Sequence, residues 1–345
     1  MRRTLGAACA VLAIALLATA IPQASAHTHR RQIPAYVKPA LSGLSALGAI
    51  NKPYFRPNKS MSRDRFARLL RSTFGRGSAG GTGKVTAREV DAALVAILGQ
   101  GAVANHLNHL RSADGWGPKV PSSFGPEIVA RDLGLRYDHA PGDEQHEAAA
   151  NDAMTQADIL YAVWEAKTSP DMWAAEELAT MELPDLSSSQ KKVVQFAFSL
   201  AGTPYVWGGE WLNRTRAGYP YGAQPHGGVD CSGFSWYVLR ASAPGWSPHR
   251  PYKGWSLPER SSAQMAEATR RKKRLGFKKL TAGDLVFFAP SGTHSSPSSV
   301  YHVGVYVGHG WMIDSSGSKD GVSLDYMGAG SWYRGQFIFG RRVIH

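Results

Sequence analysis

From Asp284 onward the hydrophobic spacing of the chain changes, and this change constrains the fold more than any other feature. Before Asp284, apolar residues recur mostly every three or four positions, as in amphipathic helices. After Asp284, short runs rich in β-branched and aromatic residues alternate with turn residues. These runs predict strands at Leu285–Phe288, Val300–Val307, Trp311–Ser315, Val322–Leu324 and Phe337–Ile344. Helices followed by strands in this order predict an α+β fold.

Two of the predicted strands form a hairpin that brings a histidine and an aspartate together. The sequence 308–310 (Gly-His-Gly) predicts a three-residue loop, which places Val305 opposite Ile313. His302 and Asp314 then share a face as diagonal neighbours, whereas a two-residue loop would put them on opposite faces. The other face is the expected core face: Tyr301, Val303, Val305, Val307, Trp311 and Ile313. Taken singly, His302 is better explained as a polar residue at a sheet edge, and Asp314 as a surface charge beside a turn; the shared face and the lone cysteine favour a joint role.

The first residues have the pattern of an export signal. Met1-Arg2-Arg3 is followed by an apolar run from Ala7 to Ile21 and by an Ala-Ser-Ala site, so residues 1–26 predict a signal peptide removed after Ala26. No later apolar stretch reaches the length of a membrane-spanning helix. We therefore expect a secreted protein, extracellular or associated with a cell wall, with no transmembrane segment.

Cys231 is then the only cysteine of the mature chain, because Cys9 leaves with the signal. A lone thiol in an oxidising compartment is either an intermolecular partner or a reactive group. The residues after Cys231 have helical spacing, so we expect the thiol at a helix N-terminus, where free N–H groups and the helix dipole favour the thiolate. The alternative is a buried thiol that packs as a small hydrophobe.

A reactive thiol needs a base, and the base needs an acceptor that orients it. The shared face of the hairpin suggests Cys231 as nucleophile, His302 as base and Asp314 as the acceptor that fixes the imidazole. No cofactor and no metal are expected. The histidines at 226, 249, 294 and 309 lack the spacing of metal ligands.

Residues 35–183 predict a helical domain with a weak internal repeat. Ser62, Thr86 and Thr155 each precede an apolar helical stripe as candidate N-caps, and Thr86 has Glu89 at the spacing of a capping box. The unit from Phe55 to Leu70 resembles S-layer homology repeats, which in that family hold proteins to wall polysaccharide. A generic helical domain is the alternative. Residues 184–189 predict a linker, and residues 190–345 a second domain.

The formal net charge of +13 indicates a polyanionic partner. For an exported protein, anionic cell-wall polymers fit this charge better than nucleic acid. The densest basic run is Arg270–Arg274 with Lys278 and Lys279. It is either a binding patch or a solvated helix end.

Four ordered motifs in the second domain resemble the NlpC/P60 family of cysteine peptidases: Pro204–Gly209, Val229–Phe234, Ala282–Phe288 and His302–Gly308. The resemblance implies a papain-like α+β core and hydrolysis of peptidoglycan stem peptides, most often between γ-D-glutamate and a diamino acid. It implies Cys231 as nucleophile and His302 as general base. The third, orienting position falls on Asp314, where the family more often has histidine.

The resemblance also implies substrate contacts. Tyr205 matches a tyrosine that shapes the substrate pocket, and Asp230 matches a position that engages the free amine of the stem peptide. Trp207 and Ser232, in the same two motifs, are further candidate substrate-binding residues. The backbone amide of Cys231 would help to stabilise the oxyanion.

Three functions remain open at this point. The first is a peptidoglycan endopeptidase, and the second is an N-acetylmuramoyl-L-alanine amidase or an acyltransferase on the same fold. Cysteine–histidine chemistry does not separate these two, because they differ only in the leaving group and the acceptor. The third is an inactive wall-binding protein, against which the intact pair of Cys231 and His302 argues.

Overall fold

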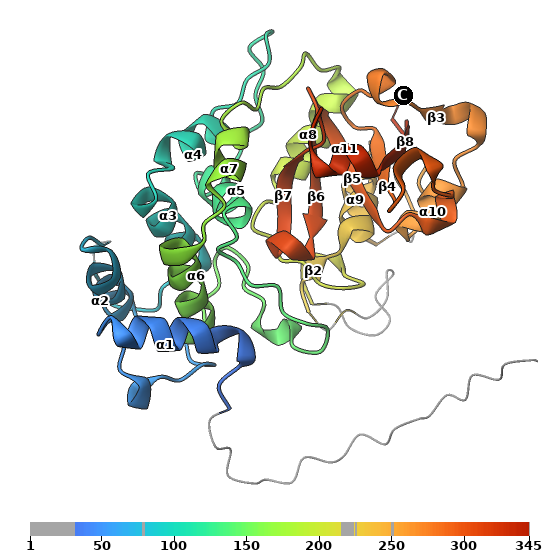
Figure 1. Ribbon diagram of the computed structural model, residues 1–345. Helices are drawn as coiled ribbons and strands as arrows, with labels where there is room; N and C mark the ends of the chain where they lie inside the picture. Colours follow the sequence, from blue (N-terminus) through green and yellow to red (C-terminus); the bar gives the residue numbers. More distant parts are fainter. Residues whose placement is uncertain (1–31, 78–79, 215–223, 225, 250–251, 345) are drawn as a thin grey trace, which may run out of the picture. The chain divides into compact units, whose positions relative to one another are not determined.

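The structure is a computed structural model that describes residues 32–77, 80–214, 224, 226–249 and 252–344 (Figure 1). The first half of the chain is helical. Its helices are α1 (Lys38–Ala46), α2 (Arg63–Phe74), α3 (Ala87–Ile97), α4 (Gly101–Asn108), α5 (Phe124–Asp132), α6 (Gln156–Thr168), α7 (Met172–Leu178) and α8 (Ser188–Phe198). Residues 1–26, the predicted signal peptide, lie outside the described residues.

The second half carries helices and an antiparallel sheet, which confirms the predicted α+β class. The helices are α9 (Cys231–Ala241), α10 (Ser262–Glu267) and α11 (Trp332–Gln336), and β1 (Glu210–Trp211) pairs with β2 (Gly228–Val229). A second sheet has the order β3-β8-β4-β5-β6-β7. Its strands are β3 (Arg274–Leu275), β4 (Leu285–Phe288), β5 (His302–Gly308), β6 (Trp311–Ser316), β7 (Gly321–Tyr326) and β8 (Phe337–Arg341).

The predicted caps begin three helices of the first half. Ser62 and Thr155 each accept a hydrogen bond from the backbone N–H three residues further on, at the starts of α2 and α6. At the start of α3, the Thr86 N–H donates to the Glu89 carboxylate over 2.8 Å, as in a capping box. These local predictions hold because a cap depends only on residues close in sequence.

The short segments that precede α2, α3 and α6 pair with one another. The residue just before each cap is apolar and buried: Met61 before α2, Val85 before α3 and Met154 before α6. β-bridges join the segments in a ring: Ser60 with Thr155, Ser62 with Lys84, and Thr86 with Ala153. Three equivalent segments therefore meet at one place, which is the arrangement that an internal repeat would produce.

The hairpin of β5 and β6 differs from its predicted form in one respect. Val305 pairs with Ile313 as predicted, but Gly308 pairs with Trp311, so that the loop has two residues and the register shifts between Tyr306 and Gly308. His309 and Gly310 both have positive φ, as a type I′ turn requires. The bulge adds the residue that the loop lacks, and the register beyond it is the predicted one. Tyr301, predicted in the core face, is instead 44% exposed.

Buried charges join helix α5 to strand β7 and the turn before it. The Arg131 side chain has no exposed surface, and its guanidinium donates to the carbonyls of Lys319 and Asp320. The Asp132 carboxylate accepts from Ser323 over 2.6 Å and binds the Lys319 ammonium. Buried charges need such partners, because desolvation is costly for each of them alone. The helical residues thus help to fix the segment that follows β6.

No helix among the described residues has both the length and the apolar character needed to cross a bilayer.

A cluster of three carboxylates lies where residues 138–147 meet the turn before β7. Oxygens of Asp138, Glu147 and Asp320 lie within 4.8 Å of one another. Burial and then the charge and hydrogen bond of Asp320 raise the pKa of Glu147 to about 11, and burial with the Asp320 charge raises that of Asp138 to about 7. Arg136 pairs with Asp320, 3.4 Å away, and is the nearest compensating cation in the cluster. The neutral form of Glu147 is therefore favoured in the folded protein.

We expect Glu147→Gln to stabilise the protein increasingly as pH rises. A carboxyl with a raised folded-state pKa holds its proton more tightly in the folded than in the unfolded state, so its contribution to stability falls as pH rises above about 4.5. The substituted glutamine would keep an acceptor for the His139 N–H, now 2.8 Å from the Glu147 carboxylate. Tm measured from pH 4.5 to 8 should diverge from wild type, while Glu176→Gln, at an exposed site on α7, should not. If Tm plotted against pH ran parallel for Glu147→Gln and wild type, the inference that the Glu147 carboxyl is neutral in the folded protein would be refuted.

Candidate active site

Cys231 is the first residue of helix α9, as the sequence predicted. Asp230 is the N-cap, and its carboxylate accepts a hydrogen bond of 2.6 Å from the Gly233 N–H. A Cβ on Gly233 would lie 2.0 Å from the Gly209 carbonyl oxygen, so only glycine allows this close approach. The cap and this contact fix the helix start, and with it the thiol, which is 8% exposed by residue.

His302 and Asp314 form a buried pair on neighbouring strands. The His302 Nε2 lies 2.6 Å from Asp314 Oδ2, and Asp314 has no exposed surface. Gly304 makes this possible, because a Cβ there would lie 2.8 Å from Met312 Sδ and 3.2 Å from Asp314 Cβ. The room beside Gly304 is thus filled by β6 side chains, which keeps Asp314 next to the imidazole.

The histidine interacts with the thiol as well as with this aspartate, because the charge and hydrogen bond of Cys231 are among the causes of its raised pKa. With Nε2 bonded to Asp314, the second ring nitrogen, Nδ1, remains for Cys231. Helix α9 packs against β5 and β6, and the Cys231 sulfur lies 3.9 Å from the carbonyl oxygen of Tyr301, the residue before His302. The structure therefore brings the three residues of the predicted triad into one site.

Opposing effects set the charge of this pair. Burial alone would lower the pKa of His302, but the charge and hydrogen bond of Asp314, and then those of Cys231, raise that pKa well above its usual value. Burial, together with Asp325, raises the pKa of Asp314 to about 7 against the effect of His302. The imidazolium is consequently stabilised where a thiol proton would be received.

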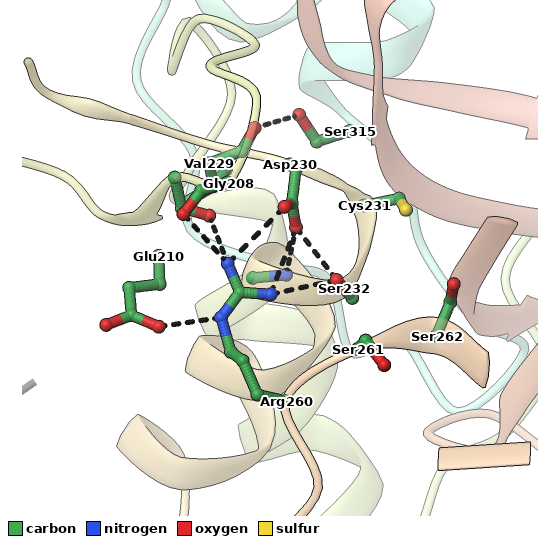
Figure 2. A network of polar contacts seen from close by, with 12 residues as sticks. Gly208, Glu210, Val229, Asp230, Cys231, Ser232, Arg260, Ser261, Ser262 and Ser315 are labelled. Atoms are coloured by element: carbon green, nitrogen blue, oxygen red, sulfur yellow. Dashed lines mark hydrogen bonds and ion pairs between the residues drawn. The ribbon is translucent and has the colours of Figure 1, made fainter. Parts of the chain in front are cut away.

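Arg260 joins the segments that surround the cysteine (Figure 2). Its guanidinium donates to the Asp230 carboxylate (3.2 Å), the Ser232 hydroxyl (2.8 Å) and the Glu210 carboxylate (2.6 Å). It also donates to the carbonyls of Gly208 and Gly209, at 3.1 and 2.9 Å. One cation thus neutralises the carboxylate of Asp230, the residue before Cys231. It also connects three segments: the turn before β1 (Gly208 and Gly209), the start of α9, and the residues just before α10.

The predicted substrate-binding residues differ in exposure: Tyr205 is half-buried, Ser232 is buried and Trp207 is exposed. Tyr205 lies beside the motif of Cys231, through a bridge to Val229, and burial, with the charges of Cys231 and Asp230, raises its pKa. Trp207 is 72% exposed. The Ser232 hydroxyl donates to Asp230 and accepts from Arg260, so it already has two partners within the protein.

Sequence reasoning missed Arg260 and Tyr333. Tyr333 lies with its ring centroid 5.8 Å from that of His302, and burial, with nearby acidic groups, raises its pKa. Arg260 precedes the Ser261 cap of α10, which marks a helix start but gives no sign of the carboxylate thirty residues earlier. Both residues come from segments whose proximity to Cys231 exists only in the folded chain.

We expect Arg260→Met to slow alkylation of Cys231 by iodoacetamide at pH 7 by about tenfold. Without the guanidinium, the carboxylate of Asp230, the residue before Cys231, is unneutralised and disfavours the thiolate. Arg260→Lys keeps the charge but loses the forked hydrogen bonds, so it should recover part of the rate. Thermal unfolding of each variant gives the control for folding. A Met variant with lower Tm and unchanged alkylation from pH 5 to 9 would mean that Arg260 acts on stability alone.

Residues 202–341 match the NlpC/P60 family. The bifunctional muramidase/DL-endopeptidase CwlT of Bacillus subtilis is 33% identical over 150 residues, which are 43% of this chain and 35% of CwlT. The probable endopeptidase p60 of Listeria innocua is 35% identical over 122 residues, 35% of this chain and 21% of that protein. The chain thus spans about a third or less of these curated relatives.

Among solved structures, the peptidoglycan hydrolase RipB of Mycobacterium tuberculosis aligns at 27% identity and a TM-score of 0.32. The alignment covers 46% of this chain and 65% of that one. The matched range, 202–341, includes Cys231, His302 and Asp314. Residues 202–341 of this chain are an NlpC/P60 family domain.

Proposed function

We propose that this protein is a secreted cysteine peptidase that hydrolyses peptidoglycan stem peptides, at the bond between γ-D-glutamate and a diamino acid. The observation that carries the proposal is the meeting of Cys231, at a helix N-terminus, with the buried pair of His302 and Asp314. The family match and the endopeptidase activity named for the relatives support the substrate class. The apolar segment at residues 1–26 supports export.

The proposed reaction proceeds through an acyl-enzyme. His302 accepts the thiol proton at the nitrogen that does not face Asp314, and the Cys231 sulfur attacks the scissile carbonyl carbon. The Cys231 N–H donates to the oxyanion that forms. Collapse of this intermediate breaks the peptide bond, and the imidazolium protonates the leaving amine. Water, deprotonated by His302, then hydrolyses the thioester and restores the thiol.

The roles of the substrate residues follow from their positions. We assign to Tyr205 the wall of the pocket beside Cys231, and to exposed Trp207 an apolar contact with the stem peptide. We assign to Asp230 the binding of the free amine of the substrate through Oδ2, which has only one partner among the described residues, Arg260, at 3.4 Å, whereas Oδ1 caps α9 and accepts from both Ser232 and Arg260. Ser232 contributes by holding Asp230 in this orientation.

The helical residues 35–183 are proposed to hold the protein at the wall. The ring of bridges between the segments before α2, α3 and α6 supports a repeat like that of S-layer homology proteins. The net charge of +13 supports anionic wall polymers as a second partner. The domain boundaries predicted at residues 184–189 remain part of this proposal.

We expect the full-length chain to release the peptide beyond γ-D-glutamate from soluble stem peptides that contain γ-D-Glu–diaminopimelate. Cys231→Ala should abolish this product, because no other described side chain of the site supplies a nucleophile to His302. Mass spectrometry identifies the bond cut. Release of the whole stem from muropeptides, or transfer to an added amine, would instead indicate the amidase or acyltransferase. Absence of any product, with binding to sacculi retained, would indicate an inactive wall-binding protein.

Replacement of Asp314 separates the effect of its charge from that of its hydrogen bond. Asp314→Asn retains an acceptor for the His302 Nε2–H but removes the charge that raises the pKa of His302. The alkaline limb of the kcat/KM profile should then move to lower pH, because the imidazolium of the active ion pair is lost earlier. Asp314→Ala also removes the acceptor and should lower kcat/KM by about 100-fold or more. Identical pH profiles for wild type and Asp314→Asn would contradict this role of the charge.

A further inference from the structure

The β3 edge of the six-stranded sheet carries a group of cationic side chains that have no acidic partner among the described residues. The six side chains extend from the segment around β3 and are all exposed: Arg270, Arg271, Lys272, Lys273, Lys278 and Lys279. We call them the basic edge. None of the six makes an ion pair with any described residue, although their neighbours Arg341 and Arg342 pair with Glu259 and Asp284.

The local structure holds these charges close together. Two short 3-10 turns, Arg271–Lys273 and Phe277–Lys279, flank β3 and present the cations on both sides of a two-residue strand. β3 pairs only with β8, so it is an edge strand. No Asp or Glu occurs from residue 268 to 283, and Glu267 is the nearest acidic residue along the chain. Like charges at this density repel each other, so they favour an anionic partner.

The chemistry of the basic edge fits a phosphate polymer better than a nucleic acid. Nucleic-acid sites without sequence preference combine cations with exposed aromatic rings on which bases stack. The one aromatic residue of the segment, Phe277, is half-buried, and the Arg334 guanidinium covers its ring at 3.8 Å. Four of the six cations are lysines, which bind phosphates as point charges without demanding a particular geometry.

The position of the basic edge separates it from the candidate active site. Strands β8 and β4 lie between β3 and β5, the strand of His302. Three strand spacings amount to roughly 14 Å, which exceeds the Debye length of about 8 Å at physiological ionic strength. Changes to the basic edge should therefore leave the charge balance around Cys231 unaffected.

We propose that the basic edge binds a phosphodiester-linked polymer of the cell wall and holds the peptidase on it while the site around Cys231 stays free. This identification of the polymer rests on the proposed function, since a wall hydrolase meets such polymers. The binding itself rests only on the charges of the basic edge. The two are therefore tested by separate measurements.

Binding is measured with the full chain carrying Cys231→Ala, so that no substrate is cut. The probes are immobilised inorganic polyphosphate, and sacculi before and after chemical removal of their phosphodiester polymers. The test variant replaces Lys272, Lys273, Lys278 and Lys279 by Gln. The matched control replaces four lysines of the helical half, all exposed and without an ion pair among the described residues: Lys38, Lys52, Lys59 and Lys84. Both variants lose the same net charge.

The test variant should bind polyphosphate at least tenfold more weakly than the control variant at 0.1 M salt, an order-of-magnitude expectation for about four lost phosphate contacts. The slope of log K against log salt concentration should fall by about 3. On sacculi the test variant is compared only with the unsubstituted Cys231→Ala chain, because the control lysines lie in the region proposed to hold the protein at the wall. The Cys231→Ala chain with all its lysines intact should bind treated sacculi more weakly than untreated ones. Equal losses of polyphosphate binding in both variants would overturn the proposal, because net charge alone would then explain binding. Tighter binding to single-stranded RNA than to polyphosphate would also overturn it.

Activity on soluble stem peptides is measured separately with Cys231 intact. The test variant should retain wild-type kcat/KM within about twofold, because the basic edge lies beyond the screening length from the site. A wild-type protein without activity would refute the proposed function but leave the polyphosphate result standing. A test variant that loses activity on soluble peptide would refute the separation of the two sites.

Discussion

The carboxylate of Asp230 determines where the thiol lies. It caps α9 by accepting from the Gly233 N–H, and it also binds the Arg260 guanidinium (Figure 2). The same guanidinium contacts the carbonyls of the turn before β1. A carboxylate at this position satisfies helix N–H groups but places a negative charge beside the sulfur. Arg260 offsets that charge, so the cap and a reactive thiol are compatible. Loss of either partner would leave the other charged and partly desolvated.

The base side of the site depends on the register of one hairpin. A two-residue loop alone would turn His302 and Asp314 to opposite faces. The bulge between Tyr306 and Gly308 adds one residue and restores the shared face. Gly304 then leaves room for Asp314 beside the imidazole. The buried pair exists because a turn, a bulge and a glycine act together.

The two edges of the six-stranded sheet have opposite surroundings. At the β7 edge, two buried side chains of α5 provide hydrogen-bond partners. Arg131 donates to the Lys319 carbonyl in the turn before β7, and Asp132 accepts from Ser323 on β7 itself. At β3, the cations of the basic edge face solvent and have no acidic partner among the described residues. The sheet therefore connects to the helical half on one side and offers a charged surface on the other. His302 and Asp314 lie on β5 and β6, between these edges (Figure 1).

The sequence by itself determined the α+β class, the helix caps at Ser62, Thr86 and Thr155, and the helix that begins at Cys231, because each depends on periodicity or on residues a few positions apart. It also paired His302 with Asp314, since a hairpin is local and its apolar pattern selects the register. Only the tertiary structure decided that Arg260 reaches Asp230, that Arg131 is buried against the turn before β7, and that Glu147 meets Asp320. These contacts join segments far apart in the chain, and the charge that each residue adopts follows from desolvation and from partners that no local pattern specifies.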